Sequence, residues 1–176
     1  LNQLLVKAND CQFSSPYEMG REIEKLFKEN YSPELNQNIS AMSDVGLIRV
    51  LNEDNWGWIQ INDALKLYIV ADGMGGHDAG EVASAMAVSL LCKEAKNRIM
   101  DNVHYSIEEL EQIFNTSFQC ANNSIKDFSE RNGSDMGTTM VAALILNDKN
   151  ALIANVGDSR AYLHREGYLY QVSKDH

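Results

Sequence analysis

Acidic residues stand at three places where the sequence pattern predicts that a strand stops. Asp72 follows an apolar run at residues 67–71 and opens a glycine-rich loop. Glu53 and Asp54 fall between two other predicted strands, and Asp158 follows a later one. Crowded carboxylates repel one another unless cations or protons lie between them, and carboxylate oxygens are the ligands that hard divalent cations prefer. The spacing therefore favours a metal site if these strand ends are neighbours.

Each acid also has an ordinary structural interpretation. A D-G pair with further glycines, as at Asp72, is often only a turn, and so is the G-D-S sequence at Asp158. Glu53 and Asp54 can equally belong to a solvated loop. The glycine-rich loop at 73–80 lacks both the P-loop lysine and the G-x-G-x-x-G spacing, which argues against a nucleotide-binding protein.

The composition limits the class of protein. A chain of 176 residues with 44% hydrophobic composition suits one compact domain. A formal net charge of -10 argues against a nucleic-acid or anionic-membrane surface, and no apolar run approaches the ~18–20 residues of a membrane span. The 3 cysteines are widely spaced and include no C-x-x-C pair, so the sequence predicts neither a disulfide framework nor a zinc site. We therefore expect a reducing, cytoplasmic location.

The order of predicted elements indicates the fold class. Predicted strands cover residues 43–50, 55–61, 67–71, 140–146, 151–156, 161–164 and 168–172, and predicted helices cover 78–99 and 106–128. Ser106 and Glu109 form a capping box at the start of the second helix. Strands, two long helices and further strands are not the alternation of a parallel sheet. We predict an α+β fold with helices covering antiparallel sheets.

The first 38 residues differ from the rest. Residues 15–18 supply a possible N-cap, a proline in the first turn and a glutamate, which predict a short amphipathic helix. Its apolar face would carry Met19, Ile23, Leu26 and Phe27. We expect 1–38 to be an N-terminal appendage on the domain at 39–176, or the tail of an upstream region.

Five ordered motifs resemble the metal-dependent Ser/Thr protein phosphatases of type 2C, especially their bacterial branch. The motifs are Arg49 with residues 52–54, residues 72–77 with 80–81, residues 136–139, residues 157–160, and residues 175–176. The resemblance covers residues 43–176. It implies a four-layer αββα fold, a β-sandwich of antiparallel sheets flanked by helices, with a metal centre at one end. Residues 39–176 would be the N-terminal two-thirds of such a domain.

The resemblance also implies roles for the acids. Asp72 would bridge two Mn²⁺ or Mg²⁺ ions, and Gly73 would offer its backbone carbonyl to one of them. Glu53 and Asp54 would complete the contacts, mostly through bound waters. Asp158 matches an acid that the family uses around a third, weaker metal. The cations would lower the pKa of a shared water, and the resulting hydroxide would attack phosphorus in line.

Two further residues have roles that the resemblance implies. Arg49 would clamp the substrate phosphate, because a guanidinium matches phosphate geometry with paired donors. In the animal branch a histidine directly follows the first D-G pair and is proposed to protonate the leaving oxygen. Met74 occupies that place in this sequence. His77, three residues further on, is the substitute, and the alternative is that it only caps or orients the loop.

The resemblance has a C-terminal limit. The family normally continues for another ~60–80 residues that carry two more metal-binding aspartates. We therefore expect a C-terminally truncated domain with little or no activity of its own. The parent protein would hydrolyse phosphoserine and phosphothreonine in the protein substrates of a Ser/Thr kinase. The alternative is a pseudophosphatase that recognises phosphorylated partners without turnover.

Overall fold

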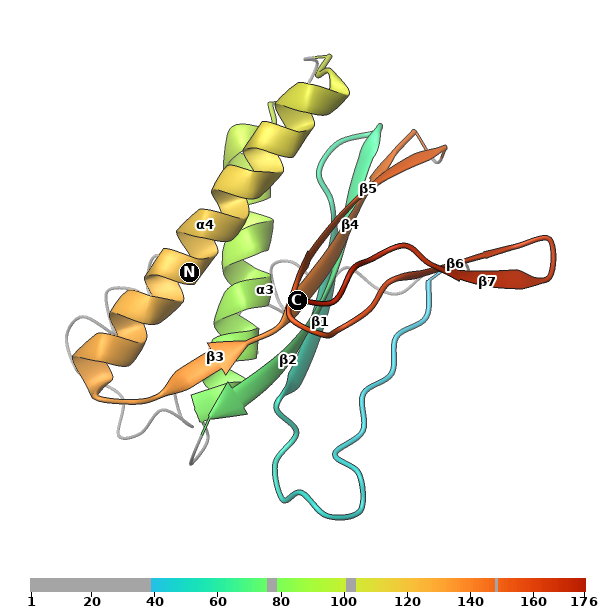
Figure 1. The fold of residues 1–176 in the computed structure, drawn as a ribbon. Coiled ribbons are helices and arrows are strands. Elements are labelled where there is room, and N and C mark those ends of the chain that lie inside the picture. Colours follow the sequence, from blue (N-terminus) through green and yellow to red (C-terminus); the bar gives the residue numbers. More distant parts are fainter. Residues whose placement is uncertain (1–38, 76–78, 101–103, 148) are drawn as a thin grey trace.

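The computed structural model describes residues 39–75, 79–100, 104–147 and 149–176 (Figure 1). The helix predicted within residues 1–38 lies outside the described residues. The strands are β1 (Asp54–Gln60), β2 (Leu65–Gly75), β3 (Met136–Thr138), β4 (Met140–Leu146), β5 (Asn150–Val156), β6 (Tyr162–Arg165) and β7 (Tyr168–Gln171), and the helices are α3 (Ala79–Arg98) and α4 (Ile107–Asn132).

A five-stranded antiparallel sheet forms the centre of the structure. Its strand order is β1-β2-β4-β5, and β3 pairs with the last residues of β2. Alternate residues of β2, from Leu65 to Ala71, are buried, as expected for a strand with one face on a core. Asp72 was predicted to follow this strand, and that prediction is wrong. The pairing of β3 with Gly73–Gly75 extends β2, so Asp72 lies within the strand.

Helix α3 lies between the sheet and α4, and both helices cover the same face of the sheet (Figure 1). Most of α3 is buried, including the polar residues Ser84 and Ser89. A helix that is apolar on nearly all sides needs such a covered position. Its many alanines allow close packing. The core between the layers includes Leu67 and Leu144 from the sheet, Leu91 from α3, and Phe114 from α4.

The predicted capping box at the start of α4 is confirmed. The Ser106 Oγ accepts a hydrogen bond from the Glu109 backbone N–H at 3.2 Å, and the Glu109 carboxylate accepts one from the Ser106 N–H at 2.8 Å. The helix ends at Gly133, which has a left-handed φ of 58°. Glycine takes this conformation without the steric cost of a Cβ. Both ends of α4 are therefore specified locally.

Replacing Ser106 with alanine is expected to destabilise the protein by about 1 kcal/mol, because the Glu109 N–H loses the hydroxyl that caps it. Urea unfolding followed by circular dichroism measures the change. Ser106→Asp is the matched control, since aspartate caps a helix about as well as serine. Equal losses in the two variants would contradict the capping explanation.

The strand predicted at residues 43–50 is wrong. Residues 46–48 form a turn, and Leu47, Ile48 and Val50 are almost fully exposed. The Asp44 carboxylate accepts a hydrogen bond from the Gly46 N–H at 2.7 Å, and Gly46 has a φ of 75°. Such a local side-chain bond offers the backbone an alternative to strand pairing. Strand composition alone did not reveal this competition.

Strands β6 and β7 form a separate hairpin that extends on the side away from the helices (Figure 1). Its turn residues, Glu166 and Gly167, both have positive φ angles, 53° and 82°, as a tight hairpin turn requires. The predicted α+β class, with antiparallel sheets and covering helices, is confirmed. No helix in the described ranges is both long and apolar enough for a membrane crossing.

Candidate metal centre

Asp54 and Asp72 are directly opposite each other in the pairing of β1 with β2. Much of the Asp72 side chain is exposed, but its partial burial at the end of the sheet raises its pKa. The Asp54 carboxylate raises the pKa of Asp72 further, the Arg49 charge lowers it, and Asp158 adds a smaller upward effect. Asp54, Arg49 and Asp158 therefore all lie near enough to Asp72 for their charges to change its pKa.

The described residues supply a small donor set. Among them, no group of three or more His, Cys, Asp and Glu side chains lies close enough together to hold a metal ion. What they contain is the facing pair Asp54 and Asp72, with Asp158 near enough to act on Asp72 through its charge. Two repelling carboxylates fit a divalent cation, because the cation would relieve their repulsion. Asp54 and Asp72 could therefore supply some of the ligands of a divalent cation, but not all of them.

The raised pKa of Asp72 predicts how the stability of the metal-free protein changes with pH. Its folded pKa lies above the ordinary value of 3.8, so protonated Asp72 favours folding. This contribution is complete below 3.8 and is lost as pH rises through the folded pKa. Relative to Asp72→Asn, the parent protein should lose thermal stability over that interval, measured with a chelator present. Asp63→Asn, in the turn after β1, is the control, and parallel curves for parent and Asp72→Asn would contradict the prediction.

Glu53 joins three segments of the candidate site. Its carboxylate accepts a hydrogen bond from Arg49 Nη1 at 2.9 Å, and its side chain is only 17% exposed. Its backbone carbonyl accepts bonds from the Gly73 N–H at 3.1 Å and from the Ser84 Oγ at 2.6 Å. Glu53 therefore holds Arg49 near the acids and ties the loop before β1 to both β2 and α3.

Gly73 and Gly80 allow β2 and the start of α3 to approach very closely. A Cβ on Gly73 would lie 2.0 Å from the Gly80 carbonyl oxygen, which is backbone. A Cβ on Gly80 would lie 2.2 Å from a carboxylate oxygen of Glu53. No side chain fits at either place without displacement of its neighbour. Close packing against Gly80 therefore explains why position 73 is a glycine. This explanation is separate from the ligand role that the family resemblance implies.

The remaining predicted site residues are placed as follows. The Arg49 side chain is 63% exposed and bonded to Glu53. Asp158 lies in the turn after β5, where Gly157 has a φ of 96°. His77 lies outside the described residues. The structure therefore pairs Asp54 with Asp72 and Arg49 with Glu53. Arg49 and Asp158 both act on Asp72 through their charge.

Three hydroxyl residues that the motifs gave no role form hydrogen bonds to the backbone of Asp72 or Glu53. Thr138 Oγ1 donates a hydrogen bond to the Asp72 carbonyl at 3.0 Å. The Thr139 backbone N–H donates to the same carbonyl at 2.8 Å, and Thr139 Oγ1 accepts from the Asp72 N–H at 3.1 Å. The third is Ser84, a fully buried serine within an apolar helix face. A serine among the apolar residues of this helix face is the sequence feature that could have indicated a buried hydrogen bond at Ser84.

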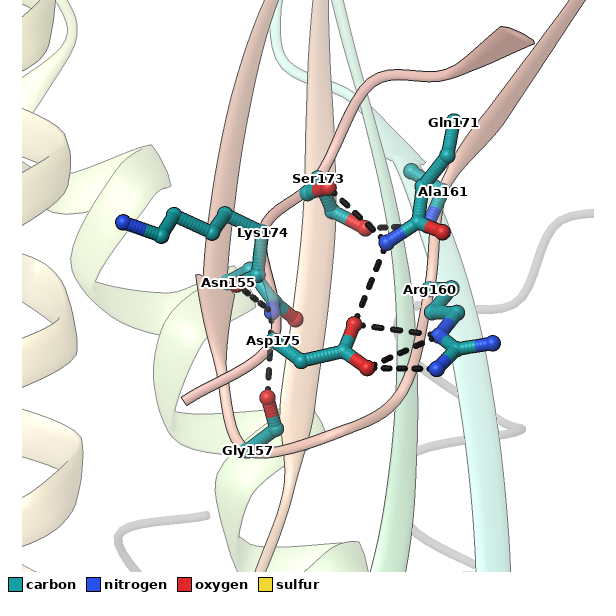
Figure 2. A network of polar contacts seen from close by, with 8 residues as sticks. All are labelled: Asn155, Gly157, Arg160, Ala161, Gln171, Ser173, Lys174 and Asp175. Atoms are coloured by element: carbon teal, nitrogen blue, oxygen red, sulfur yellow. Dashed lines mark hydrogen bonds and ion pairs between the residues drawn. The ribbon is translucent and has the colours of Figure 1, made fainter.

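Residues 174–176 contact the segment that runs from Asn155 to Arg160 (Figure 2). Arg160 Nε donates to both carboxylate oxygens of Asp175 at 3.0 Å. This pairing with Arg160 lowers the pKa of Asp175. The Asn155 amide donates to the Lys174 carbonyl at 2.9 Å, as Figure 2 also shows. The motifs at 157–160 and 175–176 therefore form one structural unit, in which Asp175 is an ion-pair partner of Arg160.

The sequence matches known proteins over most of its length. The family model for protein phosphatase 2C matches residues 31–176. A relative from Listeria monocytogenes serotype 4b, "Serine/threonine phosphatase stp", is 45% identical over 138 residues, covering 76% of this chain and 52% of the relative. The "Serine/threonine protein phosphatase PstP" of Mycobacterium tuberculosis is 33% identical over 136 residues, covering 77% of this chain and 24% of the relative. The chain spans about half the length of the Listeria relative.

Solved structures show the same fold. The serine/threonine phosphatase of S. agalactiae matches with a TM-score of 0.67 and 34% identity, covering 77% of this chain and 54% of that one. The catalytic domain of PstP, solved in complex with 2 manganese ions, matches with a TM-score of 0.61 and 33% identity, covering 77% and 54%. Together with the family match over residues 31–176, these similarities show that the chain belongs to the protein phosphatase 2C family.

Proposed function

We propose that the protein containing this chain hydrolyses phosphoserine and phosphothreonine in other proteins in a metal-dependent reaction. The observation that carries the proposal is the pairing of Asp54 with Asp72, at the site where Arg49 also lies. Family membership supports the reaction class, because the relatives are named as serine/threonine phosphatases. The substrates would be phosphorylated proteins.

The residues present fit one side of a dinuclear centre. Asp72 and Asp54 would hold Mn²⁺ or Mg²⁺ through carboxylate oxygens, Gly73 through its carbonyl, and Glu53 through water, with Asp158 beside a third ion. Two manganese ions are present in the structure of the related PstP catalytic domain. When bound, such cations supply charge neutralisation for phosphate and lower the pKa of water. The remaining ligands would come from outside the described residues.

Arg49 would bind the phosphate of the substrate. Its Nη1 is bonded to Glu53, and most of its side chain is exposed to solvent. Glu53 can therefore orient the guanidinium while other N–H groups of Arg49 bind phosphate oxygens in pairs. The positive charge would also offset the negative charge of Asp54 and Asp72 as a phosphate dianion approaches. A role for His77 in protonating the leaving oxygen is part of this proposal.

A phosphoprotein-binding module without turnover is the second candidate function. The observation that favours it is the small donor set, because the described residues gather no three metal-ligating side chains. Such a module would keep Arg49 for phosphate recognition and would need no complete metal shell. Binding of a phosphopeptide without hydrolysis distinguishes it from the phosphatase.

The composition and the free cysteines support a cytoplasmic setting. The chain has a net charge of -10, which disfavours nucleic acid as a partner. Cys92 and Cys120 are both free thiols, and Cys92 is buried. Free thiols are usual in a reducing compartment. We propose that the protein acts there, on the substrates of a Ser/Thr kinase.

The test is hydrolysis of p-nitrophenyl phosphate and of a phosphothreonine peptide by the protein of the complete reading frame. Turnover should require Mn²⁺ or Mg²⁺, disappear with a chelator and return when metal is restored. Residues 1–176 alone should show little or no turnover. Absence of turnover by the complete protein, with retained peptide binding, would replace the phosphatase by the binding module. Strong metal-dependent turnover by 1–176 would contradict the expected incompleteness of the site.

A further inference from the structure

We propose that Thr139 is a positioning residue that fixes Asp72 relative to the turn carrying Asp158 and so sets the affinity of the centre for divalent cations. This inference rests on the proposed metal-dependent function. Thr139 lies between β3 and β4, the two strands that pair with the end and with the first part of β2. From there it contacts both acid-bearing segments.

Thr139 bonds to both backbone polar groups of Asp72. Its N–H donates to the Asp72 carbonyl at 2.8 Å, and its Oγ1 accepts from the Asp72 N–H at 3.1 Å. The side-chain hydroxyl therefore does part of what a neighbouring strand's backbone normally does. The backbone of Asp72 is held on both sides of its Cα, which restricts where the carboxylate can lie.

The same hydroxyl reaches the turn of the third acid. Thr139 Oγ1 and Ser159 Oγ share a hydrogen bond at 2.6 Å. A threonine oxygen has two lone pairs and one proton, so it can accept from Asp72 and still bond to Ser159 in either direction. Ser159 directly follows Asp158. One side-chain oxygen thus connects the segment of Asp72 to the segment of Asp158.

The methyl group of Thr139 completes the contact. A Cβ built on Gly157 would lie 2.7 Å from Thr139 Cγ2, so the turn backbone packs directly on this methyl. Asp158 is therefore bracketed by two residues, Gly157 and Ser159, that both touch Thr139. Valine would retain the branched shape and the packing on Gly157, and would remove only the hydroxyl.

Loss of the hydroxyl should weaken metal binding more than it weakens the fold. The backbone bond from Thr139 N–H to Asp72 would remain, as would the methyl contact to Gly157. The Asp72 N–H and Ser159 Oγ would lose their common partner, and the two acids could shift independently. A net hydrogen bond of ordinary strength corresponds to roughly a tenfold change in an equilibrium constant. We expect Thr139→Val to weaken Mn²⁺ binding by roughly that factor.

The experiment uses the complete protein with MnCl₂ as the probe. Mn²⁺ binding is followed by the electron paramagnetic resonance of the free ion, beside thermal melting without metal and hydrolysis of the phosphothreonine peptide over a Mn²⁺ titration. Thr139→Val should raise the Kd for Mn²⁺ roughly tenfold, with a matching shift of the Mn²⁺ dependence and a smaller change in kcat at saturating metal. Thr139→Ser, which keeps the hydroxyl, should restore parent-like binding.

Two further variants keep the test decisive. Ser159→Ala removes the other end of the shared bond and should weaken Mn²⁺ binding in the same direction. Thr116→Val is the matched control, because Thr116 Oγ1 donates to the Gln112 carbonyl at 2.8 Å within α4, away from the acids. Parent-like Mn²⁺ binding in Thr139→Val, equal weakening in Thr139→Ser, or the same loss in Thr116→Val would overturn the proposal.

The outcome also separates this proposal from the proposed function. If the parent protein binds Mn²⁺ but hydrolyses nothing, the phosphatase proposal fails, while the binding constants still decide the role of Thr139. If the parent protein binds no Mn²⁺, the proposed metal centre and the role of Thr139 both fail.

Discussion

Replacing Asp72 with asparagine in the complete protein is expected to lower metal-dependent phosphatase turnover by about three orders of magnitude or more. The expectation follows from the site, because Asp72 faces Asp54 across β1 and β2 and lies within the influence of Asp158 and Arg49. Asparagine keeps the shape but removes the charge that would bind cations, and metal catalysis of phosphoryl transfer accounts for several kcal/mol of transition-state stabilisation. Hydrolysis of the phosphothreonine peptide at saturating Mn²⁺ measures the loss.

The control for this prediction is Asp63→Asn, which removes an exposed aspartate from the turn between β1 and β2. It should leave turnover within about twofold of the parent, because exposed surface changes away from a site have small effects. Thermal melting identifies any loss of fold in either variant. Turnover by Asp72→Asn at the level of Asp63→Asn would refute a metal centre built on Asp72.

Replacing Gly73 with alanine is expected to destabilise the fold by about 3 kcal/mol or more. The added Cβ would lie 2.0 Å from the backbone carbonyl of Gly80 and 2.8 Å from that of Glu53. Neither atom can move without moving β2, the start of α3 or the loop before β1, so the overlap costs more than ordinary overpacking. The midpoint of urea unfolding, with its slope, measures the loss.

Two other glycine variants isolate the cause. Gly167→Ala, in the hairpin turn, has no neighbour within 4 Å and a φ of 82°. It should therefore cost only about 1–2 kcal/mol, for the left-handed backbone. Gly80→Ala meets the movable carboxylate of Glu53 at 2.2 Å, so it should be milder than Gly73→Ala and should disturb the bond from Arg49 to Glu53. A smaller loss for Gly73→Ala than for Gly167→Ala would contradict the close packing.

The sequence predicted those features that depend on local patterns. The capping box of Ser106 and Glu109 is determined by four successive residues, and the structure contains it. Apolar runs bounded by turn residues predicted β1 and β4 close to their bounds, whereas β2 extends beyond the predicted 67–71 at both ends. The strand predicted at 43–50 failed because Asp44 and Gly46 form a local turn that competes with pairing. Apolar composition does not show whether a partner strand exists.

The candidate site depends on contacts between segments far apart in the sequence. The motifs indicated which acids belong together, and the pairing of Asp54 with Asp72 agrees with that prediction. They did not show that the Glu53 carboxylate turns toward Arg49, or that Ser84 holds the Glu53 carbonyl. The role of Thr139 depends on residues 67 and 20 positions away. Such distances lie beyond any local periodicity.

Anomalous X-ray scattering from crystals of the complete protein grown with MnCl₂ tests the central claim most directly. We expect manganese peaks beside the carboxylates of Asp72 and Asp54, with further acids from outside the described residues completing the shell. Clear density for Asp72 and Asp54 without manganese at either carboxylate, in a protein that still hydrolyses the phosphothreonine peptide, would contradict it.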